Sequence, residues 1–161
     1  MKKLHIILVA AGVVILALLA ACSGTKYRDD VAVSDIADKV GAYVTGYEEM
    51  TKMDDAYLKG AMKMDVSKFS DYVVCINPYG STIDEFGVFK AAGKDGKEAL
   101  KEVEAYLDLR RETWMNEYLP EEKPKLEAAV ARQDGLYVIY VILDEESRIG
   151  ALAAFDAALV K

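Results

Sequence analysis

The apolar run Leu136–Leu143, with the sequence LYVIYVIL, restricts the fold more than any other segment of the chain. Its β-branched and aromatic residues are typical of a strand, and the absence of alternating polar positions indicates a strand that is covered on both faces. Asp134 and Gly135, just before the run, are a strong signal for a two-residue hairpin turn. The sequence therefore predicts a central strand, paired through this turn with a strand at 129–132.

The remaining segments can be assigned from their periodicity and their breaking residues. Ser34 is a suitable N-cap for a helix over 35–50, and the segment 54–69 fits a turn of helix followed by a loop. We expect a hairpin of strands at 71–77 and 85–91, a helix at 96–118 that Pro120 ends, a short helix at 124–128 and a last helix at 145–160. The order α-β-β-α-β-β-α predicts a single α+β domain, in which helices pack on an antiparallel sheet of about four strands formed by two hairpins.

The N-terminal segment predicts export from the cytoplasm. Lys2 and Lys3 precede an uncharged apolar run of 16 residues, Ile6–Ala21. A basic start, an apolar centre and small residues at the end are typical of a secretory signal peptide, and a permanent membrane span needs about 20 apolar residues. The alternative is an uncleaved anchor helix followed by an incidental cysteine.

The tetrapeptide Leu19–Cys22, LAAC, resembles the lipobox of bacterial lipoproteins. The resemblance implies cleavage between Ala21 and Cys22 and a diacylglyceryl group on the Cys22 thiol, and two acyl chains give a stable membrane anchor. We therefore expect a signal peptide at 1–21, the lipidated cysteine and a tether at 22–33, and the α+β domain outside the membrane at 34–161. The membrane lipid is then the first predicted partner.

Charge and residue types exclude several classes of function. Without Lys2 and Lys3, 18 basic residues remain against 27 acidic ones, a net charge of about −9 that disfavours nucleic acid as a partner. The one histidine, His5, lies in the predicted signal peptide, so the domain lacks histidine for a catalytic triad or a common zinc site. No phosphate loop or dinucleotide motif is present, and we expect no cofactor and no metal.

Cys75 lies in the apolar run YVVCI at 72–76. Two readings are open, a reactive thiol and a small core residue on a buried strand. No neighbouring base is evident that would lower its pKa, which favours the core residue.

Asp84, Glu85, Phe86 and Gly87 form the candidate functional motif of the chain. The two carboxylates are candidates for an acid/base pair or a cation site, but adjacent strand residues point to opposite faces unless a bulge intervenes. The alternative is that Asp84 ends a loop while Glu85 pairs with Lys90 or Arg110, and that Gly87 allows a bulge or a close approach of Trp114. A cleft that gathers Asp84 and Glu85 with Asp54 and Asp55 would favour a hydrolase.

The lipobox, Trp114 and the strings IDEFGVFKA at 83–91 and GLYVIY at 135–140 together resemble a family of small lipoproteins from Gram-positive bacteria that share a domain of unknown function. The resemblance covers about Val33 to Phe155. It implies a membrane-anchored domain outside the cytoplasm and assigns no catalytic residue. We expect a noncatalytic binding or accessory module with an envelope protein or glycan as partner; the alternative is a carboxylate-dependent enzyme that acts on cell-envelope material.

Overall fold

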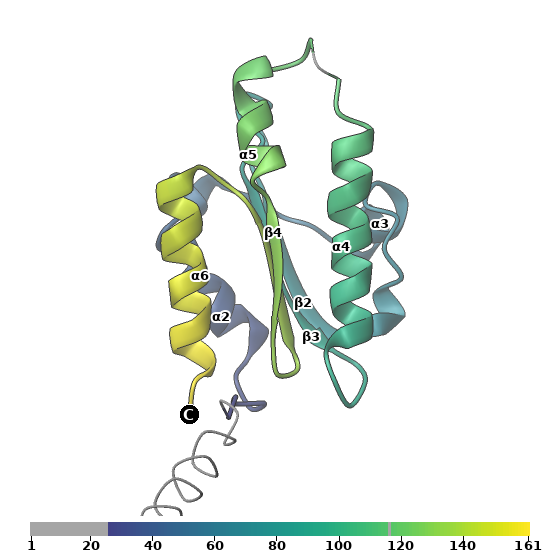
Figure 1. Cartoon of the computed structure of the whole chain (residues 1–161), viewed down its shortest axis with the longest axis vertical. Coiled ribbons are helices and arrows are strands. Elements are labelled where there is room, and N and C mark those ends of the chain that lie inside the picture. Colours follow the sequence, from purple (N-terminus) through teal and green to yellow (C-terminus); the bar gives the residue numbers. More distant parts are fainter. Residues whose placement is uncertain (1–25, 116) are drawn as a thin grey trace, which may run out of the picture.

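The computed structural model describes residues 26–115 and 117–161. In this part of the chain, one antiparallel sheet of five strands lies between two layers of helices (Figure 1). The strand order is β1-β2-β3-β5-β4, so the β2-β3 and β4-β5 hairpins join along β3 and β5. The expected mixture of helices with one antiparallel sheet is confirmed.

The described elements follow one another along the chain with short connections. In chain order they are α2 (Val33–Gly41), the 3-10 helix η1 (Tyr47–Glu49), β1 (Thr51–Lys52), α3 (Asp55–Gly60), η2 (Val66–Lys68), β2 (Phe69–Ile76), β3 (Glu85–Ala91), α4 (Lys97–Glu112), η3 (Pro120–Glu122), α5 (Lys123–Glu127), β4 (Val130–Asp134), β5 (Tyr137–Ile142) and α6 (Glu145–Leu159).

The sheet has one strand more than the four that we expected. The additional strand, β1, contains only Thr51 and Lys52, which pair with Ile76 and Cys75 at the edge of β2. A strand of two residues is too short to show a period in the sequence, and it forms because β2 offers it an unpaired edge. β3, the strand that carries the candidate motif, has the bounds that we predicted.

The first helix is shorter than predicted, and Ser34 does not cap it. α2 begins at Val33, with Ala32 as its N-cap, because Val33 is fully buried in the same stripe as Ile36 and Val40. The helix ends at Gly41, where the Tyr47 ring lies so close that a Cβ on the glycine would be 2.5 Å from it. The chain therefore turns back over the helix end instead of continuing as helix to Met50.

The long helix α4 ends at Glu112, earlier than the end at Tyr118 that we predicted. The hydroxyl of Thr113 donates a hydrogen bond of 2.7 Å to the carbonyl of Leu109, which also accepts one of 3.0 Å from the Thr113 amide. Trp114 consequently lies beyond the helix, half-buried. The second hairpin turn is also displaced by one residue: Asp134 pairs with Tyr137, so Gly135 and Leu136 form the turn, with Gly135 at φ 62°.

Side chains of β3 and β5 alternate between the two faces of the sheet. The face toward α2 and α6, called here the α6 face, holds Phe86, Val88, Ile139 and Val141, all with 0 % exposure. The opposite face, toward α3 and α4, is called the α4 face. Cys75 packs on the α6 face, where burial raises the pKa of its thiol to about 11, so its prediction as a core residue is confirmed.

The first described residues are fixed to the domain, although they fall within the range expected for the tether. Tyr27 forms an antiparallel bridge with Val160, and the amide of Arg28 donates a hydrogen bond of 2.8 Å to the carbonyl of Leu159. Val31 and Val33 are buried in the core of the α6 face. Among residues 26–115 and 117–161, no helix combines the length and the apolar character needed to cross a bilayer. The predicted signal peptide and Cys22 lie outside the described residues.

Candidate functional site

The two carboxylates of the candidate motif enter separate networks. Asp84 lies just before β3, and its carboxylate accepts a hydrogen bond of 2.9 Å from the Lys125 ammonium and one of 2.8 Å from the Thr82 hydroxyl. Glu85, the first residue of β3, points into the α4 face and is 2 % exposed. The motif therefore gives no acid/base pair of adjacent carboxylates.

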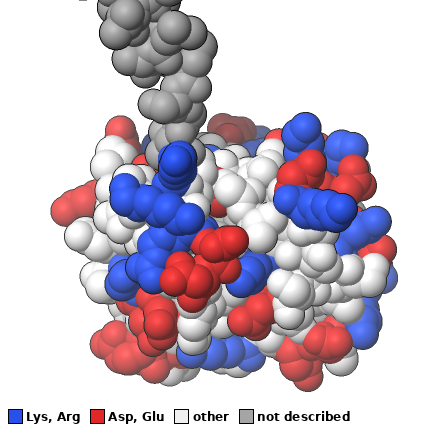
Figure 2. Space-filling view, turned by 90° about the horizontal axis from the view of Figure 1, so that it is seen from below, with Lys and Arg blue, Asp and Glu red and all other residues white. Residues whose placement is uncertain are grey.

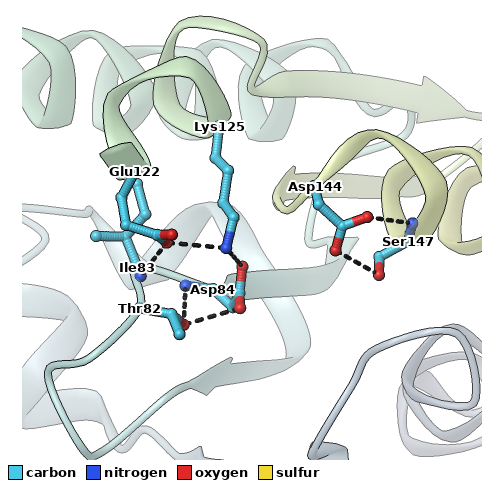
Figure 3. Close-up of polar contacts among 7 residues, drawn as sticks. All are labelled: Thr82, Ile83, Asp84, Glu122, Lys125, Asp144 and Ser147. Atoms are coloured by element: carbon cyan, nitrogen blue, oxygen red, sulfur yellow. Dashed lines mark hydrogen bonds and ion pairs between the residues drawn. The ribbon is translucent and has the colours of Figure 1, made fainter. Parts of the chain in front are cut away.

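Asp84 belongs to an ion cluster that ties α5 to the loop before β3 (Figure 3). Lys125 lies between Asp84 and Glu122, which is 2.8 Å from its ammonium, and Glu122 also accepts a hydrogen bond of 3.1 Å from the Ile83 amide. Burial opposes the charged form of Lys125, but the hydrogen bonds to Glu122 and Asp84 raise its pKa. Because each group of this cluster has its partners within the domain, its role is structural: it holds α5 against the loop before β3.

The neighbouring pair in Figure 3, Asp144 and Ser147, caps helix α6. The Asp144 carboxylate accepts a hydrogen bond of 3.0 Å from the Ser147 amide and one of 2.8 Å from its hydroxyl, and the amide bond in particular lowers the pKa of Asp144. A hollow of about 600 Å³ lies between this cap and residues 42–45. The Asp144 and Ser147 side chains at its edge bond to each other, and this pair serves to cap α6.

Glu85 is held by three side chains on the α4 face. The hydroxyls of Tyr106 and Tyr140 donate hydrogen bonds of 2.5 Å and 3.0 Å to its Oε1, and Arg110 Nη2 lies 3.4 Å from its Oε2. Burial raises the pKa of Glu85, and the positive charge of Arg110 opposes this rise. Of the two basic partners considered from the sequence, Arg110 is the one that pairs with Glu85; Lys90 instead donates to the carbonyl of Asp29.

Gly87 makes this network sterically feasible. It pairs with Tyr140 across β3 and β5, and a Cβ at position 87 would lie 2.4 Å from the Tyr140 ring and 2.7 Å from the Phe89 ring. The Tyr140 ring therefore passes over the glycine, and its hydroxyl reaches Glu85 two residues along β3. From the sequence, Gly87 was expected to allow a bulge or a close approach of Trp114. Neither is found: the pairing of β3 is regular at Gly87, and the atoms nearest to its Cβ position belong to Tyr140 and Phe89.

A cavity of about 350 Å³ opens beside Glu85, between α3 and the end of α4. We call it the Glu85 cavity; besides Glu85 its lining includes Tyr57, Met62, Lys63, Tyr106 and Arg110. Lys63 is exposed and takes a left-handed conformation with φ 58°. The cavity thus places two cations beside one buried carboxylate, in a domain whose overall charge is negative.

Arg110 has hydrogen-bonding capacity that the described part of the chain does not use. Its guanidinium carries five N–H donors. It makes one long hydrogen bond, to Glu85, and its Nε is buried without an acceptor. Burial opposes the charged form, but Glu85 keeps the pKa of Arg110 raised, so the group stays cationic. An Arg side chain that is 29 % exposed at a cavity, with spare donors, is suited to bind an acceptor group.

The carboxylates that a hydrolase would need do not converge on this cavity. Asp54 accepts a hydrogen bond of 2.9 Å from the Tyr57 amide and caps α3, while Asp55 accepts bonds from Tyr72 and Lys59. Of the four carboxylates considered from the sequence, Glu85 alone lines the cavity. The described residues also contain no group of three or more His, Cys, Asp or Glu side chains suited to a metal ion.

Several residues of the site were not singled out from the sequence. Tyr140 was counted within the apolar run at 136–143, Tyr106 was not singled out in its helix, and Tyr57 and Lys63 fell in the segment 54–69, which was expected to be a turn of helix followed by a loop. One signal was available: Tyr106 and Arg110 are four residues apart in a predicted helix, so their side chains lie on the same face of that helix. Their common partner, Glu85, is more than 20 residues away in sequence and follows only from the fold.

Residues 43–143 match the model of a family described as a domain of unknown function, DUF4358. The matched range contains the candidate motif, the Glu85 cavity and the strands β1 to β5. No curated protein and no solved structure matches the chain.

Proposed function

We propose that this chain, which belongs to the DUF4358 family, is a lipid-anchored lipoprotein outside the cytoplasm, with a noncatalytic binding or accessory domain. In this proposal, acyl chains on Cys22 hold the protein at the cell membrane, and the Glu85 cavity receives a hydrogen-bond acceptor of an envelope protein or glycan. The anchor and the binding site are supported by separate observations.

The anchor is supported by the sequence LAAC at Leu19–Cys22, at the end of an apolar run too short for an ordinary span. Two acyl chains bind a membrane stably, because burial contributes about 0.8 kcal/mol per CH₂ group. The described helices give no alternative attachment, since none of those in residues 26–115 and 117–161 is suited to span a bilayer.

The binding role rests on the unused donors of Arg110 at the Glu85 cavity. The Glu85 Oε2 atom lies 3.4 Å from Arg110 Nη2 and orients the guanidinium, while the Arg110 side chain is partly exposed. Lys63 adds a second positive charge, and Tyr57, which is 38 % exposed, supplies surface for an apolar contact. A partner that presents a carboxylate or another acceptor beside an apolar group fits this arrangement.

The alternative, a carboxylate-dependent enzyme on cell-envelope material, has less support. Glycoside hydrolysis ordinarily uses two carboxyl groups about 5 to 9.5 Å apart. Glu85 is the one carboxylate of the cavity lining, and three side chains of the domain already occupy it. The geometry therefore favours binding over hydrolysis.

The anchor is tested by replacing Cys22 with Ala and separating membranes from soluble material. We expect the wild-type protein in the membrane fraction with incorporated acyl label, and Cys22→Ala without label and released from the membrane. Cys75→Ala is the matched control, because Cys75 is buried in the domain and should not affect attachment. Tight membrane attachment of an unlabelled Cys22→Ala protein would refute the lipid anchor.

The binding site is tested with a photo-crosslinking residue at Thr113, which lines the Glu85 cavity, in intact cells. The matched control carries the same residue at Glu112, exposed and one position earlier, outside the lining. We expect one dominant adduct from Thr113, which Arg110→Lys weakens because a lysine keeps the charge but loses the planar set of donors. Equal adducts from both positions, unaffected by Arg110→Lys, would refute the assignment of the site.

A further inference from the structure

The first described residues mark the end of the domain that is nearest to Cys22. Tyr27 forms an antiparallel bridge with Val160. It also packs on the turn at Gly135, where an added Cβ on the glycine would lie 2.9 Å from the Cβ of Tyr27. The Lys90 ammonium, near the end of β3, donates a hydrogen bond of 2.7 Å to the carbonyl of Asp29. The chain thus enters the domain beside the Ala91 end of β3 and the C-terminal end of α6.

Chain length limits the distance between this end and the lipid anchor. Lys26 is four positions after Cys22, and an extended chain spans at most about 3.6 Å per residue. Whatever conformation these residues adopt, the backbone of Lys26 lies within about 14 Å of the Cys22 Cα. With Cys22 lipidated, the end of the domain around Tyr27 therefore faces the bilayer.

The charge around this entry point differs from that of the whole domain. Lys and Arg side chains gather where the described part of the chain begins (Figure 2). The described basic residues here are Lys26, Arg28, Lys90 and Lys161, linked through the contacts of residues 26–30 with β3 and with residues 159–161. Asp29 and Asp30 oppose them, and Asp30 is paired with Arg28 at 3.0 Å. The entry region is locally basic, whereas the domain as a whole is acidic.

We propose that this basic entry face, formed by Lys26, Arg28, Lys90 and Lys161, lies against the headgroups of anionic phospholipids and orients the domain on the membrane. The proposal rests on the lipid anchor at Cys22. A basic side chain near an anionic leaflet contributes about 1 kcal/mol, within a screening distance of about 8 Å. The acidic remainder of the domain is repelled by the same surface, so the two effects favour one orientation.

This orientation holds the Glu85 cavity away from the membrane. Glu85 is six residues before Ala91 on β3, which corresponds to about 20 Å along the strand. Thr113, at the cavity, follows α4, whose 16 residues span about 24 Å from Lys97. The cavity is therefore accessible to partners beyond the headgroup layer, while the entry face contacts the lipid.

The orientation is tested with single fluorescent labels on the full-length lipidated protein, reconstituted in vesicles that carry a nickel-chelating quencher on a small fraction of headgroups. Lys94→Cys places the label in the loop after β3, Glu104→Cys in the middle of α4 and Thr113→Cys at the cavity; all three positions are exposed. Cys75 is fully buried, so the wild-type protein serves as the labelling blank. The vesicles contain phosphatidylcholine alone or with phosphatidylglycerol.

We expect quenching to decrease from Lys94→Cys through Glu104→Cys to Thr113→Cys, with a steeper decrease in anionic vesicles. Adding Lys26→Glu and Lys161→Glu should remove the difference between the two lipid compositions. Vesicle-bound protein with equal quenching at the three positions, or the same decrease in neutral and anionic vesicles, would overturn the lipid contact and leave the anchor intact. Lipidated protein that fails to bind either kind of vesicle would overturn the anchor and the orientation together.

Discussion

On the α6 face, the apolar side chains of Phe86 and Val88 in β3 pack against α2 and α6. On the α4 face, Glu85 of the same strand contacts two tyrosine hydroxyls and an arginine. The same two strands, β3 and β5, supply both faces. The α6 face buries apolar surface, which contributes about 25 cal/mol per Å² removed from water. The α4 face buries a carboxylate, which is costly unless it is paired and hydrogen-bonded.

The difference between the faces indicates where a partner can bind. On the α6 face, the buried hydroxyl of Tyr137, at the start of β5, donates a hydrogen bond of 2.6 Å to the carbonyl of Val31. On the α4 face, Arg110 keeps unused donors beside a cavity. Apolar packing on both faces holds the sheet together, and the Glu85 network on the α4 face, with unused donors of Arg110, is where a partner can gain hydrogen bonds. Four pairs of substitutions test this contrast.

Phe155→Ala should have the largest effect on stability. Phe155 is fully buried on the α6 face, and removing a buried Phe side chain costs about 3 to 5 kcal/mol. The free energy of unfolding is measured by urea denaturation of the detergent-solubilised protein. Ile149→Ala on the same helix is the control, because Ile149 is 61 % exposed and should cost far less. Equal losses for both variants would show that the α6 face does not carry the stability of the domain.

Gly87→Ala should be the next most damaging, although it adds only one methyl group. The added Cβ would meet the rings of Tyr140 and Phe89, both fully buried, and such overpacking costs about 1 to 3 kcal/mol. Gly60→Ala is the matched control: nothing lies within 4 Å of its Cβ position in α3, so it should be neutral or stabilising by about 0.5 to 1 kcal/mol. A Gly87→Ala protein as stable as the wild type would contradict the close approach of Tyr140.

Tyr106→Phe and Tyr137→Phe remove the same oxygen atom from opposite faces. The Tyr106 hydroxyl donates to the Glu85 carboxyl, and a hydrogen bond to a charged group contributes about 1.5 to 3 kcal/mol. The Tyr137 hydroxyl donates to a neutral carbonyl, a bond that contributes about 0.5 to 1.5 kcal/mol. We expect Tyr106→Phe to lower the urea midpoint more. The reverse order would contradict the contrast between the faces.

Glu85→Gln should change how stability depends on pH. Burial raises the pKa of Glu85 above its ordinary value of 4.5, so the folded state binds this proton more tightly than the unfolded state. The contribution of Glu85 to stability is then fully present below pH 4.5 and is lost as the pH rises through the interval up to the raised pKa. The stability of the wild type relative to Glu85→Gln should therefore fall from acid to neutral pH.

Urea midpoints of both proteins between about pH 4 and about pH 8 measure this change. Glu98→Gln is the control with the opposite sign, because the hydrogen bond from Lys101 lowers the pKa of Glu98. Its contribution is present above the ordinary pKa and is lost as the pH falls. If the difference between wild type and Glu85→Gln stays constant over this range, Glu85 does not have the raised pKa that its burial implies.

Local pattern was sufficient for much of the fold. The run at 136–143 was correctly identified as a buried central strand, and 85–91 as a strand, because β-branched and aromatic residues favour strands wherever they can be covered. Helix ends were predicted less well. Gly41 and Thr113 end their helices through contacts with Tyr47 and with the Leu109 carbonyl, and neither contact is visible as a period.

The sequence by itself determined the mixture of helices with one antiparallel sheet, the central strand, and the string of residues from Ile83 to Ala91 that carries the candidate motif. Only the tertiary structure decided that the two neighbouring carboxylates form separate ion pairs, Asp84 with Lys125 and Glu85 with Arg110. Strand and helix periods depend on neighbouring residues, whereas the partners of a buried carboxylate come from elements far apart in the chain. The Glu85 cavity exists because folding brings α3, β3 and the end of α4 together.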